Sequence, residues 1–304
     1  MQDKALALIG AEVGEGASDP GCKWGARALR ERGLAEFLAR PERPAGWSSM
    51  VRARSAQSAA ERLDAVAAFS SRLAQAVTRA LRRGDLPVVI GGDHSCAVGT
   101  WSAVAQAHRP GGPIGLIWVD AHLDAHTPAT SHTQAPHGMP VAALLGHGAS
   151  ALAGLYGWLG KIRPEHLVIV GARSYEAGEK ALLERLGVRI MYMPEVQRRG
   201  FGACMEEAMQ RVRRATSAWG LSFDLDALDP VDAPGTGTPV ESGIGLQAAL
   251  DALRDCARQP GCAALELVEY NPAHDVDGRT ALASFALLDA ATPSSTAPLQ
   301  RLVA

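Results

Sequence analysis

The stretch IGLIWVDAHLD, residues 114–124, decides how this sequence folds. Its first part, Ile114–Val119, is an apolar run with the length of a buried strand. Acidic and histidine side chains follow at once, at Asp120, His122 and Asp124. In an extended chain, side chains two residues apart point to the same side. The pattern therefore predicts a strand that leaves the core and presents these three side chains on one face.

The same alternation of apolar runs and amphipathic stretches extends along the chain. Further strands are expected at Leu6–Ile9, Leu86–Ile90, Leu167–Val170, Val188–Met191, Leu221–Phe223 and Leu265–Val268, and helices at Gly25–Leu38, Ala60–Arg82, Ser95–Ala107, Val141–Leu145, Glu179–Leu186, Glu206–Ala215, Leu246–Ala257 and Arg279–Ala290. Such alternation favours an α/β fold with a mostly parallel sheet and helices on both faces. We predict one domain over residues 1–304, with residues 293–304 as a tail that is loose or contacts a neighbouring subunit.

The composition excludes several classes of protein. The 304 residues are 47% hydrophobic and 20% charged, which is typical of a folded globular protein and not of a disordered one. A net charge of −2 offers no electrostatic footprint for nucleic acid, and no apolar run reaches the ~18 residues of a membrane span. The five cysteines form no C-x-x-C pair, which favours a reducing, cytoplasmic location.

Two further acidic and histidine segments also follow predicted strands. Asp224 and Asp226 come after Leu221–Phe223, and Gly91-Gly92-Asp93-His94 comes after the strand that ends at Ile90. In open parallel sheets the chemistry lies beyond the carboxyl ends of the strands. Four carboxylates crowded there would repel one another and lose solvation, at a cost of several kcal/mol per ion. The sequence therefore predicts that these carboxylates are neutralised by bound cations.

Two divalent cations would balance the four carboxylates, and two imidazoles would complete a mixed nitrogen and oxygen ligand set. Because oxygen ligands predominate and thiolates are missing, Mn²⁺ is favoured over Zn²⁺. A single D-x-D or D-x-H motif is more often a turn or a helix cap, and Asp93 or Ser95 suits such a cap. Three segments of this kind together favour a metal pair with a bridging hydroxide, which suits a cationic guanidinium better than a phosphate ester.

Six motifs, in this order, give the sequence a family resemblance: GGDHS (91–95), DAHLD (120–124), HGMP (137–140), SFDLDALDP (222–230), GTGTP (235–239) and VEYNP (268–272). They resemble the ureohydrolase family, and most closely the arginases, over almost the whole chain. The resemblance implies a three-layer α/β fold with a mostly parallel eight-stranded sheet. It also implies two Mn²⁺ per subunit and hydrolysis of L-arginine to L-ornithine and urea through the bridging hydroxide.

The resemblance also implies roles for individual residues. One manganese ion would be bound by His94, Asp120, Asp124 and Asp224, and the other by His122, Asp120, Asp224 and Asp226, with Asp120 and Asp224 bridging. His137 resembles the proton shuttle of the family, Glu269 resembles the carboxylate that holds the guanidinium, and Thr238 lies in a loop that lines the pocket. A homotrimer or a homohexamer is implied as well.

The segment Ala125–Pro136 predicts a loop at the edge of the pocket. In arginases this loop holds the α-carboxylate of the substrate through two Asn and a Ser. The matching positions here are His126, Thr133 and Ala135, and Ala135 offers no side-chain donor. Glu176 matches an acid that binds the α-ammonium group, although it also suits the cap of the next helix.

Two other activities remain open. A different guanidino compound, such as a guanidino acid or agmatine, would suit the altered carboxylate positions. A mononuclear amidohydrolase of the deacetylase kind would share the architecture, but His94 and Asp124 argue against it because they complete the second metal site. A binding or regulatory protein without activity is disfavoured by the intact ligand set.

Overall fold

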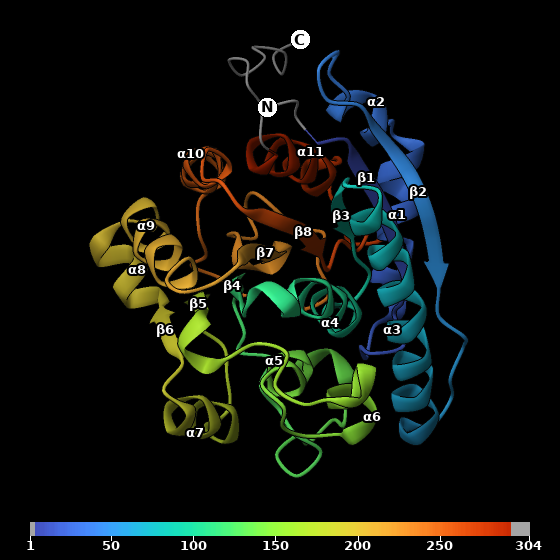
Figure 1. Ribbon diagram of the computed structural model, residues 1–304, viewed down its shortest axis with the longest axis vertical. Coiled ribbons are helices and arrows are strands. Elements are labelled where there is room, and N and C mark those ends of the chain that lie inside the picture. The colour runs from blue at the N-terminus through green and yellow to red at the C-terminus, as the bar shows by residue number, and fades with distance from the viewer. Residues whose placement is uncertain (1–3, 293–304) are drawn as a thin grey trace.

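An eight-stranded sheet runs through the middle of the molecule in the computed structural model, which describes residues 4–292 (Figure 1). The strands are β1 (Leu6–Glu12), β2 (Ala45–Arg52), β3 (Leu86–Ile90), β4 (Ile114–Val119), β5 (Leu167–Ala172), β6 (Arg189–Tyr192), β7 (Ala218–Asp224) and β8 (Cys262–Val268). All neighbouring strands pair in parallel, in the order β2-β1-β3-β8-β7-β4-β5-β6. The carboxyl ends of β3, β8, β7 and β4 therefore lie next to one another in the centre of the sheet.

Helices cover both faces of this sheet. One face carries α1 (Gly25–Glu31), α2 (Leu34–Leu38), α8 (Met193–Arg199), α9 (Phe201–Val212), α10 (Leu246–Ala257) and α11 (Arg279–Ala291), and the other carries α3 (Ala59–Arg82), α4 (Ala97–His108), α5 (Pro140–Leu144), α6 (Ser150–Ala153) and α7 (Ala177–Leu186). The strands feed both hydrophobic cores by alternation: in β4, Leu116 and Trp118 pack into one and Ile117 and Val119 into the other. The predicted three-layer α/β fold is confirmed.

Some element boundaries differ from those predicted. The strand β2 was not expected, because it is a half-exposed edge strand and has no continuous apolar run. The helix expected at Gly25–Leu38 is two helices, since Gly33 adopts a left-handed φ of 84°. Helices α6 and α8 were also not expected, and the helix predicted at Glu206–Ala215 begins earlier, at Phe201. The predicted tail, 293–304, lies outside the described residues.

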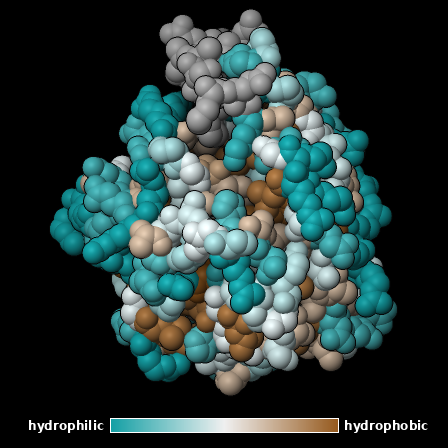
Figure 2. Space-filling view, in the orientation of Figure 1, coloured by the Kyte–Doolittle hydropathy of each residue, from teal (hydrophilic) through white to brown (hydrophobic). Residues whose placement is uncertain are grey.

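The longest helix, α3, shows how local sequence sets these elements. Its first turn is closed by a capping box, in which the Glu61 backbone N–H donates to Ser58 Oγ and the Ser58 backbone N–H donates to Glu61 Oε2. Its buried side chains lie on one stripe that packs against α4 and the sheet. No helix within residues 4–292 combines the length and the apolar character needed to cross a membrane. On the face shown in Figure 2, hydrophilic side chains predominate and hydrophobic ones gather only in small patches.

One glycine lets two loops meet at the carboxyl edge of the sheet. A Cβ atom at Gly92 would lie 1.8 Å from the carbonyl oxygen of Val13, so only glycine permits this approach. The backbone N–H of Asp93 donates to the same carbonyl oxygen at 2.9 Å. The loop after β1 thereby fixes the loop after β3, which carries His94.

Candidate metal centre and pocket

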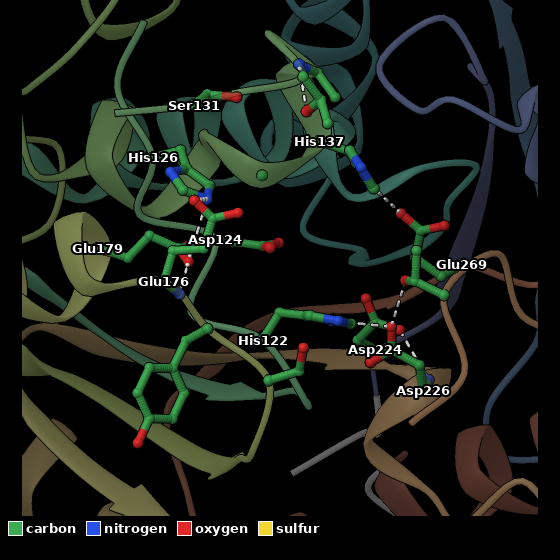
Figure 3. A pocket seen from close by; sticks show the side chains of 16 residues that line it. His122, Asp124, His126, Ser131, His137, Glu176, Glu179, Asp224, Asp226 and Glu269 are labelled. Atoms are coloured by element: carbon green, nitrogen blue, oxygen red, sulfur yellow. Dashed lines mark hydrogen bonds and ion pairs between the residues drawn. The ribbon is translucent and has the colours of Figure 1, made fainter. Parts of the chain in front are cut away.

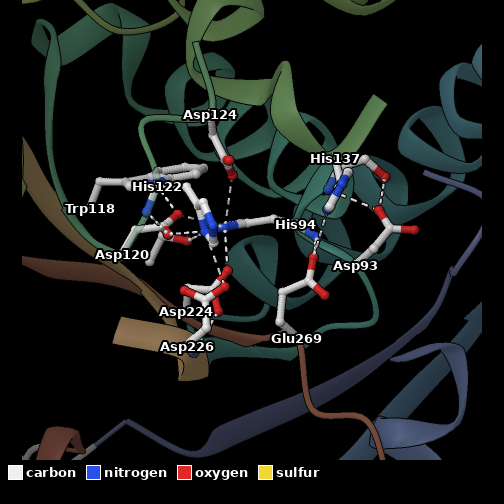
Figure 4. A network of polar contacts seen from close by, with 12 residues as sticks. Asp93, His94, Trp118, Asp120, His122, Asp124, His137, Asp224, Asp226 and Glu269 are labelled. Atoms are coloured by element: carbon white, nitrogen blue, oxygen red, sulfur yellow. Dashed lines mark hydrogen bonds and ion pairs between the residues drawn. The ribbon is translucent and has the colours of Figure 1, made fainter. Parts of the chain in front are cut away.

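Polar side chains from four neighbouring strands converge at the carboxyl edge of the sheet (Figure 4). They are His94 after β3, then Asp120, His122 and Asp124 after β4, then Asp224 at the end of β7 with Asp226 beyond it, and Glu269 after β8. All are buried except His122, which is one-quarter exposed. The structure thus brings together the three segments that the sequence singled out, and adds the predicted guanidinium-binding residue, Glu269.

The backbone reaches this arrangement through turns and not through an extended chain. Asp120 Oδ1 accepts from the His122 N–H at 2.7 Å, and Asp124 has a positive φ of 49°. After β7, Asp224 caps a short 3-10 helix and its Oδ1 accepts from the Asp226 N–H at 2.9 Å. The extended conformation predicted for the segment from Asp120 to Asp124 is therefore wrong, because side-chain hydrogen bonds to the backbone bend the chain.

The convergent side chains form two overlapping groups of possible metal ligands. His94, Asp120 and Asp224 make one group, and Asp120, His122 and Asp226 make the other, with the ligand atoms of each within 4.8 Å of one another. His94 Nδ1 lies 3.0 Å from Asp224, 3.1 Å from Asp124 and 3.2 Å from Asp120. His122 Nδ1 lies 3.2 Å from Asp226 and 3.4 Å from Asp120. Because Asp120 belongs to both groups, the arrangement suits two ions that share a ligand.

The Nδ1 atom of His94 tests whether a cation fits here. It is buried and makes no hydrogen bond, although three carboxylate oxygens surround it. Burial, followed by the charge of Asp120, raises the pKa of Asp124 to about 7 against the opposing effect of His94. Burial together with Asp226 and Asp120 raises the pKa of Asp224 well above its usual range. A divalent cation would use the idle nitrogen and remove the repulsion between these carboxylates, so the residues fit a metal pair.

Glu269 forms the other half of the site. It is buried, it has a positive φ of 65°, and its Oε1 accepts from the His94 backbone N–H at 2.8 Å. Its Oε2 accepts from the Cys22 thiol at 3.0 Å. Burial acts to raise the pKa of Glu269, but the contact with His137 outweighs burial and the pKa is lowered. A left-handed conformation in a residue other than glycine is costly, and such strain is common at functional sites.

His137 lies beside Glu269, in a short 3-10 turn, Pro136–Gly138, ahead of α5. Its Nδ1 is 3.4 Å from Glu269 Oε1, and its backbone N–H donates to the carbonyl oxygen of Gly16 at 3.0 Å. Burial lowers the pKa of His137, but the hydrogen bond and the charge of Glu269 overcome it and raise the pKa to about 9. This pKa favours the protonated form of His137 at neutral pH.

A pocket with a volume of about 210 Å³ opens above these groups. Figure 3 shows Glu269, Asp224 and Asp226 on one side of it and His126, Glu176 and Glu179 on the other. The predicted pocket residues all line it: His126, Thr133, Glu176, Thr238 and Glu269, together with Ala135. The Thr238 hydroxyl donates to Asp226 Oδ2 at 3.0 Å, so it also supports a candidate metal ligand.

The outer end of the pocket holds residues that sequence reasoning missed. Glu179 is buried, accepts from the backbone N–H groups of Ala125 and Glu176, and lies 3.2 Å from His126 Nε2. From the sequence it was only an acid inside a predicted helix. Ser131, Ser174 and Tyr175 line the pocket as well. They belong to loops, where no periodic pattern could single them out.

The position of Glu176 is compatible with both of the roles that were left open for it. It occupies the N-cap position of α7, and its half-exposed side chain also lines the pocket. His126 is more enclosed, because Nδ1 lies 3.2 Å from Thr130 Oγ1 while Nε2 faces Glu179. Both ring nitrogens of His126 therefore contact protein groups.

Comparison with known proteins finds relatives that match almost the whole described chain in sequence and in fold. Residues 4–292 match the sequence profile of the family described as "Arginase family". An arginase of Bacillus caldovelox is 38% identical over 293 residues, covering 94% of this chain and 97% of the relative. Its crystal structure superposes with a TM-score of 0.90 at 36% identity, covering 96% of this chain and 99% of the other. An arginase of Entamoeba histolytica in complex with L-ornithine gives a TM-score of 0.88 at 26% identity, with 96% and 98% covered.

Proposed function

The chain belongs to the arginase family, and on that premise we propose that it is a dimanganese hydrolase that cleaves L-arginine to L-ornithine and urea. One observation carries this proposal: two metal-ligand groups that share Asp120 face the same pocket as the buried carboxylate of Glu269. A pair of divalent ions beside an anionic group suits the hydrolysis of a cationic guanidinium.

We propose that one manganese ion is held by His94, Asp120, Asp124 and Asp224, and the other by His122, Asp120, Asp224 and Asp226. The contacts of 3.0–3.4 Å between the imidazole nitrogens and these carboxylates support both sets. When bound, the metal pair supplies a nucleophile from water at neutral pH. Asp124 lies at the pocket surface, where its carboxylate can accept a hydrogen bond from that water and orient it.

Glu269 binds and orients the guanidinium in this proposal. Its carboxylate is already fixed by donors from His94 and Cys22, so it can hold a planar cation without further ordering. His137 then gives its proton to the nitrogen that leaves as the amine of the product. Its pKa of about 9 keeps it protonated for that step, and its contact with Glu269 places it beside the bound guanidinium.

The outer end of the pocket supports an amino acid as the substrate. The oxygens of Ser131 and Thr133 accept from backbone N–H groups at 3.0 and 3.2 Å, which leaves their O–H protons free to donate to a carboxylate. Glu176 and Glu179 are acceptors for the α-ammonium group, with His126 as the wall that orients Glu179. We therefore propose that these five residues bind the amino acid end of L-arginine.

A second candidate is a ureohydrolase for another guanidino compound, a guanidino acid or agmatine. The observation in its favour is that Ala135 gives the pocket no side-chain donor while His126 contacts Thr130 and Glu179. Recognition of the substrate's α-carboxylate then depends on the hydroxyl groups of Ser131 and Thr133 alone. A mononuclear amidohydrolase is disfavoured because Asp124 lies 3.1 Å from His94 and completes a second set of ligands.

A panel of guanidines tests the choice of substrate. The protein is reconstituted with Mn²⁺, and urea release is measured from L-arginine, agmatine and 4-guanidinobutyrate. The proposal expects the highest kcat/KM for L-arginine, which alone presents both an ammonium and a carboxylate group. A higher value for either of the others would transfer the assignment to that compound, and urea from none of them would refute the activity.

We further propose that residues 1–304 act as one unit, as the single sheet from β1 to β8 supports. The five unpaired cysteines support a reducing, cytoplasmic location. A homotrimer or homohexamer is proposed from family membership, and light scattering of the purified protein tests it.

A further inference from the structure

A buried chain of polar groups lies behind His94, on the side away from the pocket. His94 Nε2 is 2.9 Å from Ser222 Oγ, and the Ser222 hydroxyl donates to Glu266 Oε2 at 2.8 Å. Ser222 on β7 and Glu266 on β8 are register partners in the sheet. The indole N–H of Trp101 on α4 donates to the same oxygen of Glu266 at 2.9 Å. All of these residues are at most 2% exposed.

The proton count along this chain assigns the tautomer of His94. A serine hydroxyl has one proton, and the proton of Ser222 goes to Glu266. The Ser222 oxygen can then only accept from His94, so Nε2 of His94 must carry a proton. Nδ1 is left with a lone pair that faces the space between Asp120, Asp124 and Asp224, where a cation would bind. Trp118 fixes the plane of the ring, because it stacks on His94 at 4.0 Å with an interplanar angle of 9°.

Glu266 is a carboxyl group buried without a basic partner among the described residues. It lies in the core, and none of the ion pairs formed by residues 4–292 includes it. Its described partners are Trp101, Ser222 and, at 3.6 Å, the Cys96 thiol. Burying a carboxyl group without a basic partner is costly, and an apolar residue here would avoid that cost. Its link to a candidate metal ligand accounts for its presence.

We propose that Glu266, acting through Ser222, is a positioning residue that fixes the tautomer and the orientation of His94 for one Mn²⁺ ion. The proposal rests on the dimanganese centre of the proposed function. Histidines that bind metals commonly donate their second ring N–H to a carboxylate, a carbonyl or a water, and loss of that partner lowers metal affinity by about 10- to 100-fold. Here the carboxylate is reached through one hydroxyl group.

Binding of Mn²⁺ to the metal-free, full-length protein tests the proposal by isothermal titration calorimetry. Ser222→Ala removes the link, and Glu266→Gln keeps its shape and an acceptor oxygen while removing the carboxylate. Ser284→Ala is the matched control, because Ser284 is also fully buried but donates within α11, to the carbonyl oxygen of Thr280. Unfolding of each metal-free variant is followed in parallel.

We expect Ser222→Ala to weaken one of the two binding steps by about 10- to 100-fold and Glu266→Gln to weaken the same step by about tenfold. The double variant should lose no more than Ser222→Ala alone, because both changes break one chain. Ser284→Ala should bind as the unchanged protein does. Equal affinities in all variants would overturn the proposal, as would an equal loss at both steps that tracks a loss of stability. If the unchanged protein binds no Mn²⁺, the proposed function fails and the role of Glu266 fails with it.

Discussion

Glu269 accepts a hydrogen bond of 2.8 Å from the backbone N–H of His94, although 175 residues separate the two in the chain. This bond joins the loop after β3 to the loop after β8. The carboxylate proposed to hold the guanidinium and a proposed metal ligand are thereby parts of one hydrogen-bonded unit. The Glu269 carboxylate is consequently held against the backbone segment that carries His94.

Asp120 should be required for both metal ions, because it belongs to both ligand groups. We expect Asp120→Ala to reduce the manganese content from two ions per chain to less than one after dialysis, as measured by elemental analysis. Asp85→Ala, which changes a partly exposed aspartate paired with Arg83 away from the pocket, should keep both ions. Two ions retained by Asp120→Ala would contradict the assignment of the shared ligand.

Turnover should depend on His137, the proposed proton donor. Without it the leaving amine receives no proton from the protein, so His137→Ala should lower kcat by ~10²–10⁴. His147→Ala, which replaces a histidine that does not line the pocket, is the matched control. Steady-state kinetics at pH 7.5 gives the comparison, and an unchanged kcat would remove His137 from the mechanism.

The pH dependence of kcat/KM should report the same residue. The pKa of His137 is raised to about 9 from a usual value of 6.5, so the protonated form is complete at pH 6.5 and disappears as the pH rises through about 9. The pairing of His137 with Glu269 also stabilises the folded protein. This stabilisation is fully present below pH 6.5 and is lost as the pH rises through about 9. We expect kcat/KM to decrease as the pH rises through about 9. The His137→Ala variant should not show this decrease. A decrease that persists unchanged in the variant would have to belong to another group.

The Cys22 thiol should support substrate binding through Glu269. Cys22→Val removes the donor to Glu269 Oε2 and leaves a buried carboxylate oxygen without its partner. We expect kcat/KM to fall about tenfold, which corresponds to about 1.4 kcal/mol for one lost hydrogen bond. Cys22→Ser retains a donor and should restore most of that loss. If serine and valine behave alike, the effect is one of packing.

Glu179 should matter for a substrate that has an α-ammonium group and not for one that lacks it. Glu179→Gln removes a charge from the outer end of the pocket, so kcat/KM for L-arginine should fall by about 10-fold or more, in line with hydrogen bonds to charged groups. Turnover of 4-guanidinobutyrate, which has no ammonium group, should change little. Glu184→Gln, at an exposed position on the same helix, controls for the altered net charge. An equal effect on both substrates would place the ammonium group elsewhere.

The sequence predicted most of the sheet and the segments that meet at its carboxyl edge, and the success of the prediction differs between elements. β3 and β4 were predicted with their observed bounds, because both are buried on two faces and read as continuous apolar runs. β2 could not be found in that way, since only one of its sides is covered. The positive φ of Asp124 and of Glu269 could not be predicted either, because only tertiary contacts hold such residues in that conformation.

The outer pocket was the least predictable part of the site. Glu179 reads as an ordinary helical acid, and its place beside His126 depends on how α7 packs against the loop after β4. Ser131 lies in that loop, where its role follows from a turn with Gln134 and not from any periodicity. The contacts of Glu179 with His126 join segments that are far apart in the sequence, so they cannot be predicted from a local sequence pattern.

The place of Glu269 beyond the last strand has a consequence for synthesis on the ribosome. All six proposed metal-binding side chains lie at or before residue 226, whereas the carboxylate proposed to hold the guanidinium is at residue 269, directly after β8, the strand that lies between β3 and β7. The two outer halves of the sheet cannot join until that central strand emerges. A nascent polypeptide therefore carries all six proposed metal ligands before it carries the residue proposed to recognise the substrate, and the proposed site is complete only once β8 takes its place.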